Sequence, residues 1–219
     1  MSPTRRPTKE DVLSAYRRSE LLTAACHVFG ERGFERATME RIASLAGVAK
    51  GTIYLYYPSK QSIYDAALSS AFSDLEEITR VRLAESKDLR EAIAAFITAR
   101  TEYFLERRDF FRMYIGAVAA HITERKGRPS ELRAMLARQT HGLEHAIGRA
   151  VADGEIRRVD PKATALAIFD LTRGLVARKL FLTQGAFDVE GHGKDVVFLV
   201  DLIWNGLERD AASQPKRKR

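Results

Sequence analysis

Apolar residues recur at helical spacing along most of the chain, which predicts helices throughout. The most informative stretch runs from residue 38 to residue 57, where two short segments follow one another. In the first segment, four apolar residues share one face: Met39, Ile42, Ala43 and Ala46. Thr38 precedes them and is a good helix N-cap, because its hydroxyl can accept a hydrogen bond from a first-turn amide. Gly47 ends the segment, since glycine adopts a left-handed backbone at little cost.

The second segment predicts a helix that is anchored at two points and open elsewhere. Ile53 and Tyr57, four residues apart, are its strongly apolar anchors. The other positions supply a cation, hydroxyls and bare backbone: Lys50, Gly51, Thr52, Tyr54 and Tyr56. A helix that enters the DNA major groove needs such a face, because base edges and phosphates are bound through hydrogen bonds and charge. The stretch therefore predicts a helix-turn-helix motif that binds DNA.

These residues resemble the N-terminal signature of TetR-family transcriptional regulators. The positions that match the family's spacing are Phe29, Gly33, Phe34, Thr38, Ile42, Ala43, Ala46, Gly47, Val48, Lys50, Gly51, Thr52, Tyr54, Ser59 and Lys60. The resemblance covers about the first quarter of the chain. Tyr56 stands where the family frequently has His, and Tyr57 where it frequently has Phe. Ala49 replaces a common Ser or Thr, which removes one helix cap and one phosphate contact.

Within this motif we expect some side chains to contact bases and others to contact the DNA backbone. Lys50, Thr52 and Leu55 are expected to face base edges, Leu55 through apolar contact with a thymine methyl. Gly51 lets the backbone approach the groove closely. The expected phosphate contacts are Thr38, Tyr54, Tyr56 and Lys60, which would fix the register.

Helical periodicity continues almost to the end, so we expect an all-α fold of about nine helices. Besides the two short helices, the expected helices span residues 11–32, 59–85, 88–107, 109–125, 130–153, 161–184 and 194–209. We expect a helix-turn-helix DNA-binding domain over residues 11–62, an effector-binding and dimerisation domain over residues 63–210, and a basic disordered tail over residues 211–219.

The distribution of charge supports a nucleic-acid partner. The net charge is +7 over 219 residues, and residues 1–62 hold 10 Lys or Arg against 6 Asp or Glu. The last seven residues hold four more Lys or Arg and no acid, whereas the body between is nearly neutral. A basic segment on a neutral body suits DNA. The single cysteine, the lack of a secretory signal and the lack of a long apolar run predict a cytoplasmic protein without membrane contact.

The rest of the chain carries no recognisable catalytic or metal-binding signature. It has no Gly-rich phosphate loop, zinc-ligand spacing or nucleophile elbow. His141 and His145 lie four residues apart, but two histidines are too few for a metal site. We therefore expect no enzyme activity, no cofactor and no metal.

The last two expected helices are apolar on more than one face, which calls for two packing partners. One partner is the core of the same subunit, and the other can be the same helices of a second subunit. The resemblance implies the same, because TetR-like proteins dimerise through their last two long helices. The expected homodimer interface comprises Phe169, Val176, Val196, Val200, Ile203 and Leu207. A fully buried monomeric core remains the alternative.

The middle helices are rich in aromatic residues, and the resemblance implies an effector pocket among them. A pocket needs apolar walls and a few polar groups. The expected lining residues are Phe96, Tyr103, Phe104, Phe111, Tyr114, His121 and Arg173. The sequence thus predicts a homodimeric, sequence-specific regulator that binds a pseudo-palindromic operator in double-stranded DNA. Repression released by a mostly apolar small molecule is the expected mode. The alternatives are an architectural DNA-binding protein without effector control and a helical enzyme.

Overall fold

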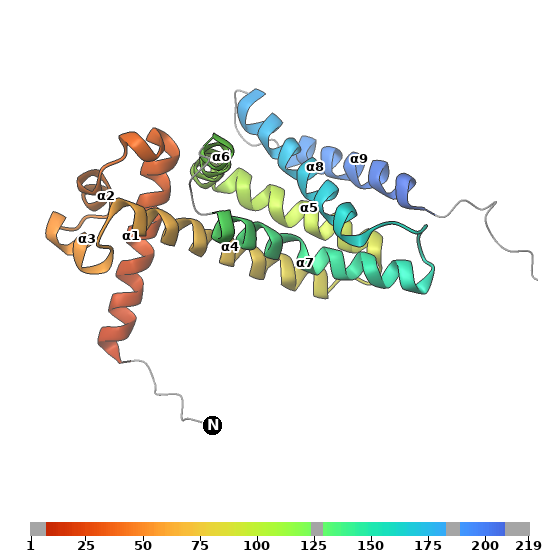
Figure 1. The fold of residues 1–219 in the computed structure, drawn as a ribbon, viewed down its shortest axis with the longest axis horizontal. Helices are drawn as coiled ribbons and strands as arrows, with labels where there is room; N and C mark the ends of the chain where they lie inside the picture. The colour runs from red at the N-terminus through yellow and green to blue at the C-terminus, as the bar shows by residue number, and fades with distance from the viewer. Residues whose placement is uncertain (1–7, 124–128, 183–188, 209–219) are drawn as a thin grey trace, which may run out of the picture. The chain divides into compact units, whose positions relative to one another are not determined.

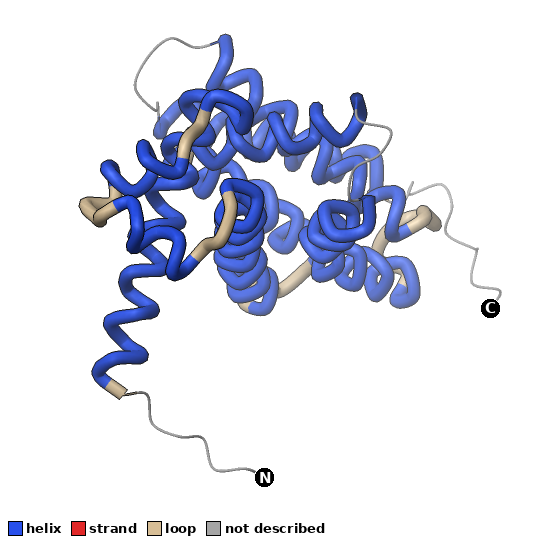
Figure 2. Tube along the Cα trace, turned by 60° about the vertical axis from the view of Figure 1, so that its left-hand side comes forward, coloured by secondary structure: helices blue, strands red, loops and turns tan. Residues whose placement is uncertain are grey.

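Helices make up nearly all of the chain that the structure describes (Figures 1 and 2). The structure is a computed structural model that describes residues 8–123, 129–182 and 189–208, with side chains for residues 8–120, 134–181 and 191–208. Its helices are α1 (Lys9–Arg36), α2 (Met39–Leu45), α3 (Lys50–Tyr56), α4 (Lys60–Ala84), α5 (Leu89–Glu106), α6 (Arg108–Thr123), α7 (Pro129–Asp153), α8 (Pro161–Leu182) and α9 (Val189–Leu207). The predicted all-α fold is confirmed over the described residues, in which Ile156 and Glu208 form one isolated antiparallel bridge.

The chain divides into two compact units. Unit 1 comprises residues 1–73 and 107–127, and unit 2 comprises residues 74–106 and 128–219. These units differ from the expected domains in two respects. The boundary falls inside α4 rather than at residue 62, and α6 groups with α1, α2 and α3. The expected tail, residues 211–219, lies outside the described residues.

Both ends of α1 and the start of α9 differ from the expected positions. Thr8 and Asp11 form a reciprocal capping box, which starts α1 at Lys9 instead of residue 11. Gly33 has φ 74°, so the predicted break is present, but a short helical segment follows it as far as Arg36. α9 begins at Val189, five residues before the expected start, and includes Gly193.

Unit 1 is held together by close packing of α1 against α6 and by a cluster of aromatic rings. A Cβ atom on Gly30 of α1 would lie 2.3 Å from the carbonyl oxygen of Asp109 in α6, so only glycine permits this approach. The ring of Phe29 meets that of Tyr64 edge to face at 4.9 Å between centroids. The Tyr64 hydroxyl donates to the Met113 carbonyl at 3.4 Å, and burial raises its pKa to about 12.

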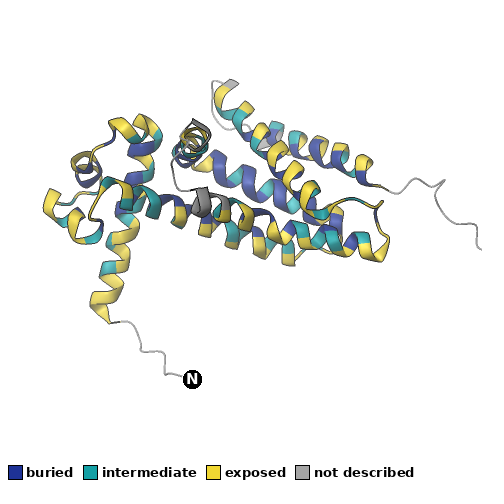
Figure 3. Cartoon of the chain, in the orientation of Figure 1, coloured by how far each residue is buried: buried dark blue, intermediate teal, exposed yellow. Residues whose placement is uncertain are grey.

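The core of unit 2 is built around α5, which carries buried residues on all sides (Figure 3). α7, α8, α9 and Ile156, which lies between α7 and α8, contribute the rest of this apolar cluster. The residues expected at the dimer interface are all buried within the subunit: Phe169, Val176, Val196, Val200, Ile203 and Leu207. They occupy the face of α8 or α9 that packs on the subunit's own core, and their part in a contact between subunits stays a prediction.

Candidate nucleic-acid interface

The turn between α2 and α3 has the geometry that the sequence predicts. Gly47 has φ 66°, a left-handed conformation that favours glycine. The Val48 amide donates to the Ala43 carbonyl at 3.0 Å, which closes the end of α2. Met39, Ile42 and Ala43 are buried, as their shared face predicts. The two helices are thus fixed at a tight angle by backbone bonds and a common core.

α3 is anchored at two points and otherwise open, and this confirms the predicted pattern. The side chain of Ile53 is fully buried and Tyr57 is nearly so. Leu55 is 83% exposed although it is a large apolar residue. Lys50, Gly51 and Tyr54 are also exposed, while Thr52 and Tyr56 are half-buried. An exposed leucine beside a cation and hydroxyls suits contact with a groove that offers both methyl groups and polar base edges.

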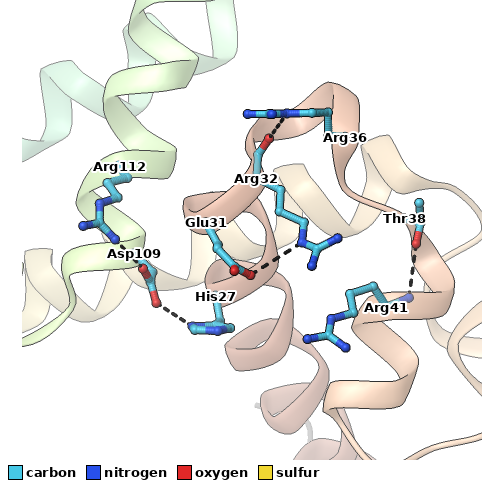
Figure 4. Close-up of polar contacts among 8 residues, drawn as sticks. All are labelled: His27, Glu31, Arg32, Arg36, Thr38, Arg41, Asp109 and Arg112. Atoms are coloured by element: carbon cyan, nitrogen blue, oxygen red, sulfur yellow. Dashed lines mark hydrogen bonds and ion pairs between the residues drawn. The ribbon is translucent and has the colours of Figure 1, made fainter.

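The start of each short helix bears out the capping analysis. The Thr38 hydroxyl accepts a hydrogen bond from the Arg41 amide at 3.2 Å (Figure 4). Ala49, by contrast, gives α3 no side-chain cap. The side chain of the N-cap residue therefore accepts no hydrogen bond from the first-turn amides of α3. This leaves donors at an exposed helix start, where negative charge is favoured.

Lys50 forms an ion pair with Glu40 that the sequence analysis did not foresee. The Lys50 Nζ atom lies 2.6 Å from Glu40 Oε1, and both side chains are more than half exposed. The hydrogen bond with Lys50 lowers the pKa of Glu40, and the same bond raises the pKa of Lys50. The pair links the first turns of α2 and α3. Its acid and base lie ten positions apart, and only the turn geometry brings them together.

Lys60 and Tyr56, both expected at phosphates, make contacts inside unit 1. Lys60 Nζ donates to the Glu35 carbonyl at 3.1 Å and lies 4.5 Å from the centroid of the Phe34 ring. The guanidinium of Arg18 lies over the Tyr56 ring at 5.3 Å. These contacts hold the side chains beside the proposed interface, and they give Lys60 a role in ending α1 as well.

Further positive charge surrounds the N-cap of α2. Figure 4 shows Arg32 and Arg36 near the end of α1, with Arg36 Nε donating to the Arg32 carbonyl at 3.2 Å. Arg32 and Arg41 are exposed as well. These residues belong to neither short apolar face, so the apolar periodicity does not point to them. A basic surface of this kind supplies affinity for phosphates without reading sequence.

The residues expected in an effector pocket fall in both units. Phe96, Tyr103 and Phe104 are buried in unit 2. Phe111 and Tyr114 are buried in unit 1, where their rings meet edge to face. The side chain of His121 lies outside the described side chains.

The positions of two arginines in this region, Arg173 and Arg100, were not foreseen from the sequence. Arg173 is about a third exposed and pairs with Asp170 at 2.8 Å, so it lies at the surface of α8. The buried arginine is Arg100 in α5, which is only 2% exposed. Its guanidinium donates to Gln139 Oε1 at 3.0 Å and lies over the rings of Phe96, Phe104 and Phe169. No pattern in the sequence marks Arg100 as buried, because one arginine in an amphipathic helix usually faces water.

The described residues contain no group of three or more His, Cys, Asp or Glu side chains that could hold a metal ion. No helix within the described ranges is both long enough and apolar enough to cross a membrane.

Comparison with known proteins identifies the class of this fold. The family model for bacterial regulatory proteins of the tetR family matches residues 21–67. The transcriptional regulator TtgR of Pseudomonas putida is 29% identical over 185 residues, which is 81% of this chain and 85% of TtgR. The repressor KstR2 of Rhodococcus jostii is 36% identical over 86 residues, which is 39% of this chain and only 42% of KstR2.

Solved structures agree with this assignment at the level of the fold. A TetR-family regulator from Marinobacter aquaeolei superposes with a TM-score of 0.73 at 22% identity, covering 90% of this chain and 99% of that one. PfmR of Thermus thermophilus gives 0.68 at 24% identity, covering 88% and 97%. The family model and the curated relatives together indicate a helix-turn-helix, DNA-binding transcriptional regulator of the TetR family.

Proposed function

We propose that the protein is a homodimeric repressor that binds a pseudo-palindromic operator and releases it when a mostly apolar small molecule binds. The proposal places it in the cytoplasm, where its DNA target lies. The observation that carries the DNA-binding role is the face of α3. It is rigidly anchored by Ile53 and Tyr57, yet it leaves Leu55 and Lys50 exposed.

In this proposal the side chains of the motif have separate tasks. Lys50, Thr52 and Leu55 contact base edges, and Gly51 allows close approach. Thr38, Tyr54, Tyr56 and Lys60 contact phosphates and set the register. No Cβ on Gly51 would meet another atom within 4 Å, so its value lies in approach to a partner rather than in packing within the subunit.

The division of labour between the units supports effector control. Unit 1 contains α2 and α3, and unit 2 contains the aromatic core around α5. The chain passes between the units three times, and two of these passages lie within the described residues: α4 continues through the boundary, and α5 ends at Glu106 just before α6 begins at Arg108. A change in the packing of unit 2 can therefore alter the direction of helices that enter unit 1. A coupling of 1–3 kcal/mol changes DNA affinity by roughly 5- to 150-fold, which is enough to switch a promoter.

The test begins with selection of bound fragments from the source genome, followed by titration of the best fragment. Lys50→Ala and Thr52→Ala should weaken binding and change the preferred bases, since both face the groove. Lys60→Ala should weaken binding to all sequences about equally and lower the salt slope by about one unit. Lys162→Ala, an exposed lysine of α8, is the matched control and should bind normally. Wild-type binding by all three motif variants would contradict the proposal.

An architectural role remains the second candidate, because the arginines near Thr38 bind phosphates without regard to sequence. Competition separates the two. A sequence-specific repressor keeps its operator in the presence of about a 1,000-fold excess of unrelated DNA, whereas an architectural protein loses it in proportion to the competitor.

A further inference from the structure

Glu40 and Lys50 place an acceptor and a donor side by side on the exposed surface of unit 1. Glu40 is the second residue of α2, and Lys50 is the first residue of α3. The Lys50 Nζ atom lies 2.6 Å from Glu40 Oε1, while 62% of the lysine side chain and 53% of the glutamate side chain remain exposed. The two polar groups therefore contact each other and are still accessible to a partner.

The backbone on both sides of this pair is fixed, so the pair has a defined position. The Val48 amide donates to the Ala43 carbonyl at 3.0 Å, which closes the turn between α2 and α3. Ile53 is fully buried and holds α3 on the core of unit 1. An exposed ion pair adds little to stability, so the fold does not depend on this acid and this base.

The hydrogen-bonding roles of the two side chains are also fixed. The hydrogen bond with Lys50 lowers the pKa of Glu40, so this carboxylate is ionised at neutral pH and can only accept. The Lys50 ammonium can only donate, because it has no free lone pair. One member of the pair therefore accepts hydrogen bonds, the other donates them, and neither can change its role.

A guanine–cytosine base pair offers the opposite arrangement in the major groove. Guanine presents two adjacent acceptors, O6 and N7, and cytosine presents its N4 amino group as a donor. A lysine suits these guanine acceptors, and a glutamate suits the cytosine amino group. O6 and N4 are neighbours, because they are hydrogen-bonded to each other within the base pair. An adenine–thymine pair fits less well, since the adenine amino group separates its two acceptors and a methyl group adjoins one of them.

We propose that Glu40 and Lys50 act together to recognise one guanine–cytosine base pair in each half of the operator. Lys50 donates to O6 and N7 of the guanine, and Glu40 accepts from N4 of the cytosine. The inference rests on the sequence-specific DNA binding proposed above, and it adds a residue of α2 to the base contacts expected from α3.

The pair also discriminates against the same base pair in the inverted orientation. The ion pair gives up its own bond on binding, which costs little because both side chains are exposed to water. With guanine and cytosine exchanged, the Glu40 carboxylate would meet the guanine acceptors and the Lys50 ammonium would meet the cytosine amino group. Both contacts are repulsive, so the pair specifies the strand that carries the guanine.

The first experiment measures the base preference at each operator position. Operator fragments in which every base pair is replaced in turn are titrated with the wild-type protein, Lys50→Ala and Glu40→Ala. Both variants should lose preference at one shared base pair, guanine–cytosine in the wild-type operator, by on the order of 10-fold. Glu77→Ala removes the acid of a similarly exposed pair with Arg80 on α4, and as the control it should keep every preference.

The outcomes of this scan separate the inference from the function on which it rests. An unchanged preference in Glu40→Ala, losses at different positions in the two variants, or adenine–thymine at the shared position would overturn the inference while leaving sequence-specific binding in place. If the wild-type protein showed no preference at any position, both the inference and the proposed function would be wrong.

The second experiment tests the contact between Glu40 and cytosine directly. N4-methylcytosine keeps its pairing hydrogen but carries a methyl group in place of the hydrogen that faces the major groove. At the shared base pair it should weaken binding of the wild-type protein by on the order of 10-fold, but binding of Glu40→Ala by less than about twofold. Equal losses in the two proteins would overturn the assignment of Glu40.

The third experiment exchanges the acid and the base. The double variant Glu40→Lys with Lys50→Glu keeps the net charge and can form the same ion pair in reverse. Because the donor then lies on α2 and the acceptor on α3, the preferred base pair should change from guanine–cytosine to cytosine–guanine. Affinity for unrelated DNA should stay within about twofold, since the net charge is unchanged. A variant that is folded by circular dichroism and retains the original orientation, or has no preference there, would overturn the inference.

Discussion

At the scale of single residues, the ion pair between Glu40 and Lys50 has the largest consequence for DNA binding. Lys50 is the only lysine or arginine within α3, and Glu40 lies 2.6 Å from it. A lysine paired in this way adds little net positive charge to the groove face. The carboxylate also repels phosphates that approach the start of α3. We therefore infer that Glu40 lowers affinity for DNA of any sequence and leaves Lys50 to bind only where a base acceptor replaces the acid.

Replacing Glu40 with Gln should therefore strengthen binding to unrelated DNA more than binding to the operator. We expect about a two- to fivefold gain on unrelated DNA, with a salt slope steeper by about one unit, because Lys50 becomes available to a phosphate. Fluorescence anisotropy at several salt concentrations measures both quantities. Glu20→Gln makes the same charge change at a half-buried pair with Arg17 on α1, and it serves as the control. Equal effects of the two variants would show that only net charge matters.

The sequence predicted the local features of this motif well and its lateral contacts poorly. Thr38, Gly47, Ile53 and the missing cap at Ala49 were all foreseeable, because caps, turns and anchors depend on residues within one turn of each other. The contacts between α2 and α3, such as the one made by Glu40, depend on the angle between two helices. Periodicity alone carries no information on that angle.

At the scale of helices, the junction between α1 and α6 is the tightest contact in unit 1. Gly30 packs directly on the backbone of Asp109, and the Asp109 carboxylate contacts His27 Nδ1 at 2.6 Å and Arg112 Nη1 at 3.2 Å (Figure 4). α1 also packs against α2. Any shift of α6 along α1 would therefore move the scaffold of the DNA-binding motif. We infer that this junction sets the angle at which α2 and α3 meet DNA.

Gly30→Ala should disturb this junction directly. Its Cβ would lie 2.3 Å from a backbone oxygen, so the two helices must separate by on the order of 1 Å. We expect a loss of about 1–3 kcal/mol in the free energy of unfolding, together with weaker operator binding. Gly116→Ala, in the exposed part of α6, is the matched control, because no atom lies within 4 Å of its Cβ. That variant should be neutral or slightly stabilising. Thermal unfolding and titration with operator DNA measure both, and similar losses in the two variants would contradict this account.

The sequence also predicted most helices but not how they group. Pro161, Gly154 and Gly33 mark real breaks, since proline and positive-φ glycine act on the chain locally. The assignment of α6 to unit 1 depends on Gly30, whose importance appears only when its neighbour 79 positions away is known. Long-range packing of this kind leaves no periodic trace in the sequence.

At the scale of the whole molecule, the other face of α8 and α9 is a second candidate for the dimer contact. Among the side chains that the structure describes, these two helices carry six large apolar residues that remain exposed: Leu166, Leu171, Phe181, Val197, Phe198 and Leu202. Gly174 is exposed too, and no atom lies within 4 Å of a Cβ built there, so it would let a second helix approach closely. Exposed apolar residues concentrated on two helices indicate a protein–protein contact. The two-sided apolar pattern was correctly recognised, but the sequence did not show which side faced the core.

A charge introduced on the exposed face of α9 should therefore separate the subunits, whereas a charge introduced on its buried face should unfold unit 2. Phe198 is 67% exposed, and the double variant Phe198→Glu with Leu202→Glu places unpaired charges on the proposed contact surface. It should give a folded, soluble monomer, because charges buried between subunits without partners cost several kcal/mol. Ile203 is only 9% exposed, and Ile203→Glu should instead unfold unit 2. Val81→Glu, at an exposed apolar position of α4, should leave the dimer intact.

Sedimentation and circular dichroism distinguish these outcomes, and operator titration adds a functional readout. A monomer presents one recognition helix to a two-fold operator instead of two, so its affinity should fall by at least 100-fold even though α3 is unchanged. If the double variant remained dimeric, the contact would lie elsewhere.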